Sequence, residues 1–319
     1  MPHLTFRVGW AGARIGGDVD IRSDIADGGD AIMSERRQLI NRAYRLLGSF
    51  SEAEDAVQEA YARWYAMPAG QQSGIASPGA WLTTVAGRIC LDLLGSARAR
   101  RERYVGDWVP EPLPDAAEWS GGDPADRVTL DESVSMAFLV VLEQLTPAER
   151  VAFVLHDVFC HSFGEVAEIV GRTPAACRQL ASSARRRIRA ARTPADPVAR
   201  QADLVRDFKR AWEARDIGAL VGLLDPTVTA VADGGGRVDT VLGPIEGGEQ
   251  VARYAVRIAD WVPAMTILER TVNGRPGLVA ERDGVVITVM AFDVADGRIR
   301  RIWAVRNPDK LRPWTGRTR

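Results

Sequence analysis

Basic and polar side chains gather at helical spacing in the middle of the chain, after the dipeptide Thr173–Pro174. The set that one face of this predicted helix carries is Arg178, Gln179, Ser182, Arg185 and Arg186. Guanidinium, amide and hydroxyl groups on one helix can reach base edges and phosphates in a major groove of DNA. The spacing therefore predicts a DNA-binding helix. The alternative is an ordinary helical hairpin with a solvated basic face, because short patterns of this kind also match by chance.

Two preceding helices and a tight turn must position this helix. A threonine precedes a proline at 146–147 and again at 173–174, which is an N-cap followed by a helix-starting proline. On either side of the second cap, a small residue, a glycine and a small apolar residue would allow close helix crossing, a turn and packing of the last helix. These three residues are Ala167, Gly171 and Cys177. Residues 145–190 therefore predict a helix-turn-helix.

A second candidate interface lies upstream, on an amphipathic helix predicted over residues 51–66. Ser51 followed by Glu54 has the spacing of a capping box that would start this helix. The polar face carries Asp55, Gln58, Glu59 and Arg63, with Trp64 as a candidate anchor. Such a face either binds a protein groove that is basic and apolar, or is simply solvated.

Groups suited to single-stranded nucleic acid follow this helix. Residues 71–78 predict a polar loop, whose side chains at Gln71, Gln72 and Ser73 could meet an unstacked base. The next helix begins near Pro78 and is basic at its end. Its arginines are Arg88, Arg98, Arg100, Arg101 and Arg103. They suit phosphate contacts, which position a protein without specifying sequence. A plain surface loop remains the alternative for residues 71–78.

The composition indicates that charge acts locally. The 319 residues carry a net charge of −1, so there is no global attraction to nucleic acid. Screening confines exposed charges to about 10 Å at 0.1 M salt, so each arginine run acts by itself. The three cysteines show no CxxC pair or zinc spacing, which predicts a reduced, cytoplasmic protein without metal or cofactor. The chain shows no apolar run of bilayer length and no signal peptide, so no membrane association is expected.

Changes in composition and in hydrophobic periodicity divide the chain into segments. Residues 1–32 predict a disordered extension, and Met33 offers an alternative translation start. Two helical domains are expected at 33–103 and 127–193, the second opening with a helix that runs to Glu143. The proline-rich linker between them, 104–126, holds a candidate anchor at Trp108 and Val109. An α+β domain is expected at 199–312, followed by a flexible tail at 313–319.

The last third of the chain mixes helical and strand patterns. A helix is predicted over 203–215, a strand over 227–233, and a further strand, loop and helix between 237 and 260. Alternating runs after Thr266 are separated by Asn273–Gly274, Asp283–Gly284 and Asp296–Gly297, each a two-residue hairpin signal. Helices followed by an antiparallel sheet give an α+β arrangement.

With these elements placed, the chain resembles a sigma-70-type sigma factor of the extracytoplasmic-function (ECF) class. AEDAVQEAYARW at 53–64 resembles the region 2 helix that docks on the clamp of RNA polymerase. The segment 81–101 resembles the helix that faces the −10 promoter element. LTPAERVAFVLHDVF with the helices that follow it resembles region 4, which reads the −35 element.

This resemblance implies a promoter-specificity subunit, not an enzyme, that binds the polymerase clamp and flap and promoter DNA. The polymerase contacts would be Asp55, Gln58, Glu59, Arg63 and Trp64. The −10 contacts would be Gln71, Gln72, Ser73, Arg88, Arg98, Arg100 and Arg101. The −35 contacts would be Thr173, Ala175, Arg178, Gln179, Ser182, Arg185 and Arg186, with Arg178 and Gln179 on base edges.

The C-terminal domain resembles a SnoaL-like domain, the cone-shaped fold of nuclear transport factor 2 and ketosteroid isomerase. YVGDWVPEPLPD at 104–115, ADGGGRV at 232–238 and NPDKL at 307–311 resemble segments of an ECF subfamily in which this domain regulates in cis. The residues implied to meet the sigma regions are Asp233, Gly234, Gly235, Gly236, Asn307, Pro308, Asp309, Lys310 and Leu311. On the residues alone, the glycines are a turn between strands.

Other functions stay open for this domain. Its candidate catalytic groups, Asp239, Tyr254, Asp260 and Asp293, show no diagnostic spacing, so an enzyme with a DNA-binding appendage is less favoured. A pocket for a small-molecule ligand is the stronger alternative, lined by Trp212, Trp261, Met265, Phe292 and Trp303. A regulator that binds duplex DNA by itself and responds to a ligand is the other rival.

Overall fold

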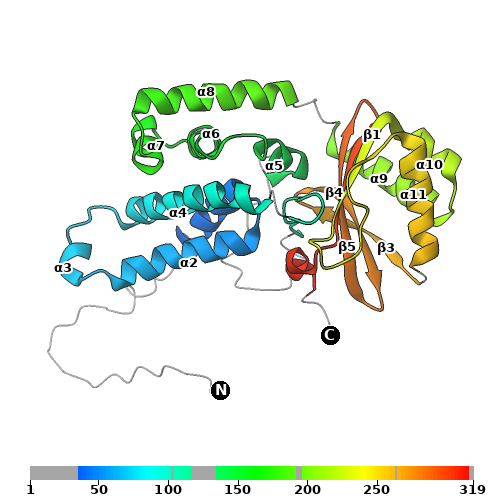
Figure 1. The fold of residues 1–319 in the computed structure, drawn as a ribbon, viewed down its shortest axis with the longest axis horizontal. Helices are drawn as coiled ribbons and strands as arrows, with labels where there is room; N and C mark the ends of the chain where they lie inside the picture. Colours follow the sequence, from blue (N-terminus) through cyan, green and yellow to red (C-terminus); the bar gives the residue numbers. More distant parts are fainter. Residues whose placement is uncertain (1–34, 102–103, 116–133, 192–195, 263, 316–319) are drawn as a thin grey trace, which may run out of the picture.

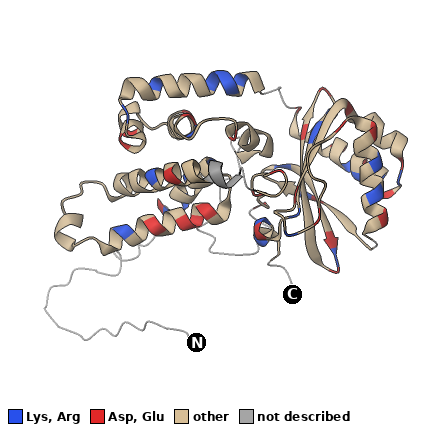
Figure 2. Ribbon diagram, viewed as in Figure 1, with Lys and Arg blue, Asp and Glu red and all other residues tan. Residues whose placement is uncertain are grey.

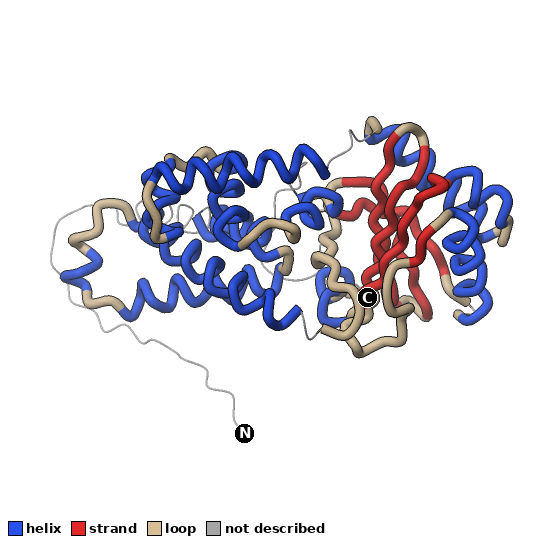
Figure 3. The backbone as a smooth tube through the Cα atoms, turned by 45° about the horizontal axis from the view of Figure 1, so that its top comes forward, coloured by secondary structure: helices blue, strands red, loops and turns tan. Residues whose placement is uncertain are grey.

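The computed structural model describes residues 35–101, 104–115, 134–191, 196–262 and 264–315. Two helical parts lie side by side at one end of the molecule, and a helix-and-sheet domain lies at the other (Figures 1 and 3). The expected fold class is confirmed: two all-helical regions precede an α+β domain. The extension 1–32, Met33, Arg103 and residues 116–126 of the linker fall outside the described residues.

The first helical part holds a helix over 35–47 and then α2 (Phe50–Ala66), α3 (Ala69–Gln72) and α4 (Pro78–Arg101). The cap of α2 is Ser49, whose side chain accepts from the Glu52 amide, so the predicted capping box at Ser51 is wrong by two residues. Gly48 has a φ of +68°, which ends the preceding helix and lets the next one start at once. The predicted loop at 71–78 begins with the last turn of α3.

The second helical part holds α5 (Met136–Leu142), α6 (Pro147–Phe153), a π-helical turn (Val154–Val158), α7 (Phe163–Val170) and α8 (Pro174–Ala191). Thr146 forms a capping box with Glu149, and the Thr173 hydroxyl accepts from the Ala176 amide at 3.2 Å. Gly171 has a φ of +69° at the turn. The predicted helix-turn-helix is confirmed. Within the described residues, the helix that leads into it starts at Met136.

The C-terminal domain is a six-stranded sheet with three helices on one face (Figure 1). Its elements are α9 (Val198–Glu213), α10 (Ile217–Leu223), β1 (Leu224–Asp233), β2 (Ile245–Glu246), α11 (Gly248–Trp261), β3 (Thr266–Val272), β4 (Arg275–Arg282), β5 (Val285–Ala295) and β6 (Arg298–Val305). The strand order is β2-β1-β6-β5-β4-β3, with β1 parallel to β6 and the other pairs antiparallel.

The three predicted hairpins are confirmed, since both residues of each turn dipeptide have positive φ. Of the strand, loop and helix predicted between 237 and 260, the helix is α11 and the strand is only the two residues of β2. Arg237 and Val238 donate their amides back to the Gly234 carbonyl. Within this segment, Ile245 and Glu246 pair with β1.

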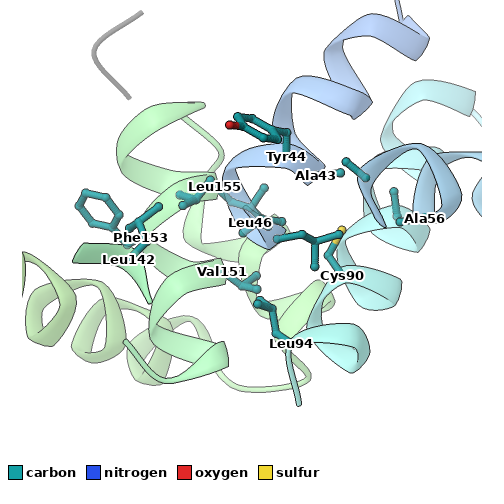
Figure 4. Close-up of a cluster of buried hydrophobic side chains, with 14 of the residues drawn as sticks. Ala43, Tyr44, Leu46, Ala56, Cys90, Leu94, Leu142, Val151, Phe153 and Leu155 are labelled. Atoms are coloured by element: carbon teal, nitrogen blue, oxygen red, sulfur yellow. The ribbon is translucent and has the colours of Figure 1, made fainter. Parts of the chain in front are cut away.

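Apolar side chains form three buried clusters. One is continuous across both helical parts and includes Leu46, Cys90 and Val151 (Figure 4). A second fills the space between the sheet and its helices. The third lies on the other face of the sheet and joins Trp303 and Leu311 to Val109 and Met136. Val109 belongs to the segment between the two helical parts and Met136 to α5. This third cluster therefore attaches the C-terminal domain to the rest of the protein.

Candidate nucleic-acid interface and the junctions around it

The outward face of α8 carries the predicted DNA contacts. Thr173, Ala175, Arg178, Gln179, Ser182 and Arg186 are all exposed. The Arg178 guanidinium lies 5.5 Å from the centre of the Phe163 ring, which orients it without consuming its hydrogen-bond donors. Arg185 is half-buried and pairs with Asp157 at 2.6 Å. The helix therefore presents a basic surface to solvent (Figure 2).

The predicted polymerase-binding face lies on α2, which is strongly acidic in Figure 2. Asp55, Gln58, Glu59 and Arg63 are exposed, and Glu59 and Arg63 form an ion pair of 2.8 Å. Trp64 is half-buried, with its ring 5.3 Å from that of Trp81 on α4. The tryptophan thus helps to hold α2 against α4 beside the exposed face.

The polar residues at 71–73 have different surroundings. Gln72 donates its side-chain amide to the carbonyls of Trp64 at 2.8 Å and Met67 at 3.2 Å. It therefore closes the C-terminal end of α2. Gln71 and Ser73 are exposed and remain accessible to a ligand. The side chains of Arg98, Arg100 and Arg101 lie outside what the structure describes.

Arg88 is engaged by the helix-turn-helix. Its guanidinium donates to the Glu168 carbonyl of α7 at 2.9 and 3.3 Å. One residue earlier, a Cβ on Gly87 would lie 2.9 Å from the Ile169 side chain, so α4 and α7 approach closely. This contact was not predicted from the sequence. Its only local signal is a glycine inside an apolar helix.

A buried arginine reinforces the junction between the helical parts. The Arg150 guanidinium donates to the carbonyls of Leu142 and Leu46 and pairs with Glu143 at 2.7 Å. Burial lowers the pKa of Arg150 to about 9. Because these acceptors belong to both helical parts, the arginine ties the helix-turn-helix to the first helical part.

Residues 104–115, here called the strap, lie between the first helical part and the C-terminal domain. The Glu111 carboxylate accepts from the amides of Phe50 at 2.8 Å and Ser51 at 3.4 Å, and from the Ser49 hydroxyl. It thus caps α2 across the fold. Burial is the main cause that raises the pKa of Glu111 to about 7. This part of the predicted flexible linker is packed, so the linker interpretation is wrong for residues 104–115.

The strap is fastened to the C-terminal domain by a group of residues here called the clasp: Tyr104, Val109, Asp233, Asn307 and Lys310. Asp233 is fully buried and accepts from the Tyr104 hydroxyl at 2.7 Å and the Val109 amide at 2.9 Å. Lys310 pairs with Asp233 at 2.7 Å and also donates to the Val109 carbonyl. Asn307 donates to the Tyr104 hydroxyl at 2.9 Å.

Neighbouring residues complete the clasp. Lys310 also lies 4.1 Å from the Trp108 ring centre, so the predicted anchor at Trp108 and Val109 does contact the rest of the protein. A Cβ on Gly234 would lie 2.3 Å from the Val238 carbonyl, and one on Gly235 2.3 Å from the Asn307 amide nitrogen. The glycines therefore permit the close approach of the two segments.

The other residues of the NPDKL segment have separate contacts. Pro308 starts a 3-10 turn (Pro308–Lys310), and Asp309 pairs with Arg237 at 3.1 Å. Leu311 is buried in the third apolar cluster, together with Trp303.

A further contact comes from the turn between β3 and β4. Asn273 donates its side-chain amide to the Tyr44 hydroxyl at 2.7 Å and the Val134 carbonyl at 2.9 Å. Its side-chain oxygen accepts from the Leu113 amide at 3.0 Å. The residue was predicted only as a hairpin turn. One asparagine thus contacts both helical parts and the strap.

The C-terminal domain encloses a cavity of about 510 Å³ between its sheet and α11. Three of the predicted lining residues, Trp212, Trp261 and Met265, do line it. The prediction is wrong for the other two. Phe292 packs against Phe208 at 5.6 Å, and Trp303 lies in the cluster on the opposite face of the sheet.

Two of the four candidate catalytic groups of this domain, Asp239 and Tyr254, line the cavity. The other two lie elsewhere: Asp260 pairs with Arg215 on the surface, and Asp293, whose pKa is raised by burial, lies outside the cavity lining. Among the described residues, no group of three metal-binding side chains comes together. Within the same part of the chain, no helix is both long and apolar enough to cross a membrane.

Comparisons with known proteins identify the class of this fold. The Sigma-70 region 2 family matches residues 31–100, and the Sigma-70 region 4 family matches residues 135–188. These ranges are the two helical parts, so the protein is of the sigma-70 type.

Relatives of similar length define the family. The chain is 38% identical to the ECF RNA polymerase sigma factor SigJ of Mycobacterium tuberculosis, over 86% of this chain and 90% of the relative. It is 36% identical to the probable ECF sigma factor SigI of that species, over 88% and 93%. The crystal structure of SigJ aligns with a TM-score of 0.71 at 36% identity, covering 89% of this chain and 98% of that one. The chain therefore belongs to the ECF sigma factor family, whose members are transcription initiation factors and not enzymes.

Proposed function

We propose that this sigma factor binds the polymerase clamp and flap and both promoter elements in the cytoplasm, and that its C-terminal domain restrains it in cis. The exposed acidic face of α2, with Asp55 and Glu59, suits a basic groove on polymerase. Gln71, Ser73 and the arginines of α4 suit the −10 element. The outward face of α8, with Arg178 and Gln179, suits the −35 element.

The arrangement of the helical parts supports a restrained state. By their positions, the −35 and −10 elements lie roughly 25 base pairs apart, or about 25 × 3.4 = 85 Å along B-DNA. Regions 2 and 4 are instead in direct contact, with Arg88 of α4 bonded to α7 at 2.9 Å. They must separate before both elements can be bound. Separation would also release Arg88 for a phosphate contact.

The C-terminal domain contacts both regions, and this is the basis for its proposed role. Asn273 bonds to Tyr44 of region 2 and to Val134 at the start of region 4. Met136 of α5 packs into the third apolar cluster, together with Trp303 and Leu311 of the C-terminal domain. One domain that contacts both regions stabilises the form in which they are together.

The clasp gives the strongest support for restraint in cis. Asp233 and Lys310 are buried, and each depends on the other and on the strap for its hydrogen bonds. Loss of one partner leaves a buried charge without compensation, which is strongly unfavourable. The clasp is therefore expected to form as a unit or not at all, as a switch requires.

Run-off transcription with purified core polymerase tests the restraint. Lys310→Met should increase initiation several-fold, because it weakens the attachment of the strap and favours separation of regions 2 and 4. Lys209→Met is the matched control, since Lys209 pairs with Glu213 on α9, away from the strap. Energy transfer between labels in regions 2 and 4 should report the separation. Equal transcription from folded Lys310→Met, Lys209→Met and wild type would exclude restraint through the clasp.

The interface residues are tested separately. Asp55→Arg combined with Glu59→Arg should abolish co-purification with core polymerase, while Glu213→Arg on α9 should not. Arg178→Ala should relax specificity at one −35 position at a cost of about 1–3 kcal/mol. Uniform weakening at every −35 position would assign Arg178 to the DNA backbone instead.

A further inference from the structure

The cavity of the C-terminal domain has the size and walls of a ligand site. Its volume of about 510 Å³ lies within the range of small-molecule pockets, roughly 300–1,000 Å³. Ile258 of α11 and Met265 and Met290 from the sheet side give it apolar walls. Trp212 also lines the cavity. Its indole nitrogen already donates to the Ala255 carbonyl at 2.6 Å, so the ring contributes an apolar surface and no free hydrogen-bond donor. A mainly apolar molecule fits these walls.

One end of the cavity has the opposite character. Among the described lining residues, Arg306 is the cation and Asp239 the anion. Arg306 donates to the backbone carbonyl of Asp239 at 2.6 Å, while the Asp239 carboxylate is exposed to water. A guanidinium has five N–H donors, so Arg306 can also bind a carboxylate. Tyr254 and Thr240 add hydroxyl groups to the lining.

The mouth of the cavity supports an anionic, partly aromatic or aliphatic ligand. Trp261 lines the cavity and is 61% exposed, so it lies where the cavity meets solvent. The Arg257 guanidinium lies 4.5 Å from the centre of this ring. A second cation thus lies near the entrance, where it would attract an anion.

The cavity and the clasp share their backbone. Ala232 lines the cavity and directly precedes Asp233 of the clasp. Arg306 lines the cavity and directly precedes Asn307, and the amides of both residues donate to the Asp233 carbonyl at 2.7 and 2.9 Å. A ligand that draws the Arg306 guanidinium away from Asp239 would act on the segment that bears Asn307 and Lys310.

We infer that this cavity binds an apolar monocarboxylic acid, with the carboxylate on Arg306, and that occupancy changes the strength of the clasp. The second half rests on the proposed regulatory role of the clasp, whereas the first half does not. The sigma factor would then respond to an amphipathic acid without a separate anti-sigma protein.

Calorimetry on the full chain tests binding with two probes, dodecanoate below its micelle concentration and 1-naphthaleneacetate, and with dodecylamine as the cationic comparison. At least one acid should bind the wild type and the amine should not. Arg306→Met should weaken acid binding at least tenfold, as expected for loss of a charge-assisted hydrogen bond. Arg253→Met, on the exposed side of α11, is the matched control and should bind normally.

A second variant keeps the test independent of the arginine. Ala280 is buried and lines the cavity, so the ring of Ala280→Phe should occupy part of it and weaken binding at least tenfold. Binding of neither acid, or equal binding by wild type, Arg306→Met and folded Ala280→Phe, would overturn the site.

Hydrogen exchange at the Val109 amide tests the coupling, because this amide donates to Asp233. The bound acid should change the exchange rate at least threefold in wild type and leave it unchanged in Ala280→Phe. Binding without this change would overturn the coupling alone. The proposed restraint is tested separately, by transcription with Lys310→Met in the absence of any acid.

Discussion

Two of the junctions between the described parts of the chain are built differently. Region 2 meets region 4 through one continuous apolar cluster, supplemented by Arg88 and Arg150 (Figure 4). The strap meets the C-terminal domain largely through buried polar groups, with Asp233 and Lys310 at the centre. Apolar contacts are non-directional and tolerate small shifts. Buried charged contacts are directional and costly to break in part.

Because of this difference, the polar junction is better suited to act as a switch than the apolar one. The apolar interface between regions 2 and 4 is non-directional, so it can stabilise several relative positions of the two regions. A polar clasp has one satisfied geometry, so its loss is a discrete event. We therefore expect substitutions in the clasp to have larger local effects than substitutions between regions 2 and 4.

The largest effect is expected from Asp233→Asn. The substitution removes the carboxylate that pairs with the buried Lys310, and breaking a buried ion pair costs about 3–5 kcal/mol. Hydrogen exchange of the Val109 amide should accelerate accordingly. Asp309→Asn is the control, because the Asp309 ion pairs are exposed and worth about 0–1 kcal/mol. Similar exchange in the two variants would contradict the central role of the buried pair.

The next effect depends on pH at Glu111. Its pKa rises from 4.5 to about 7 in the fold, a difference worth about 3 kcal/mol. Because the folded pKa is the higher one, the proton stabilises the fold. This contribution is complete below pH 4.5 and is lost as the pH rises through about 7. Glu111→Gln cannot ionise, so the stability of wild type relative to this variant should fall from pH 4.5 to 8. Urea unfolding at each pH measures it, and a constant difference would refute it.

A smaller effect is expected at Asn273. Asn273→Gly keeps the left-handed backbone at a φ of +51° but removes the side-chain hydrogen bonds to Tyr44, Val134 and Leu113. The expected loss is about 1–3 kcal/mol in thermal unfolding. Asp283→Gly is the matched control, with a φ of +54° in an exposed turn, and should be close to neutral. Equal losses would mean that backbone freedom, not these contacts, sets the effect.

The smallest effect concerns the apolar junction. A Cβ added at Gly95 of α4 would have no neighbour within 4 Å. Gly95→Ala should therefore raise the free energy of unfolding by about 1 kcal/mol through its higher helix propensity. Gly87→Ala would place its Cβ 2.9 Å from the Ile169 side chain, so Ile169 must move and the gain should be lost. The melting temperatures of the two variants compare these outcomes. A Gly87→Ala variant that melts as high as Gly95→Ala would show that α4 and α7 can separate freely.

The sequence predicted the local features well. The threonine caps of α6 and α8, the turn at Gly171 and the three hairpin dipeptides all depend on residues within a few positions of one another. The exposed faces of α2 and α8 followed from helical periodicity for the same reason. The cap of α2 was misplaced because Glu111, far along the chain, shares in it.

What the sequence missed involves partners distant in the chain. Asn273 looks like an ordinary turn residue, yet its partners Tyr44 and Leu113 belong to region 2 and the strap. The strap looks like a proline-rich linker, yet partners distant in the chain hold it in place at Val109, Glu111 and Leu113. Periodicity likewise could not assign Phe292 and Trp303 to their places around the sheet, because it shows that a side chain is buried without showing what it packs against.

Local spacing along helices was enough to recognise the family and to locate the exposed faces of α2 and α8 that carry the proposed polymerase and DNA contacts. Packing between distant segments set the rest: region 4 lies against region 2, Asp233 and Lys310 bond to the strap, and the cavity borders the same backbone. These features depend on which surfaces meet, and burial of apolar area and buried charge is optimised over the whole fold.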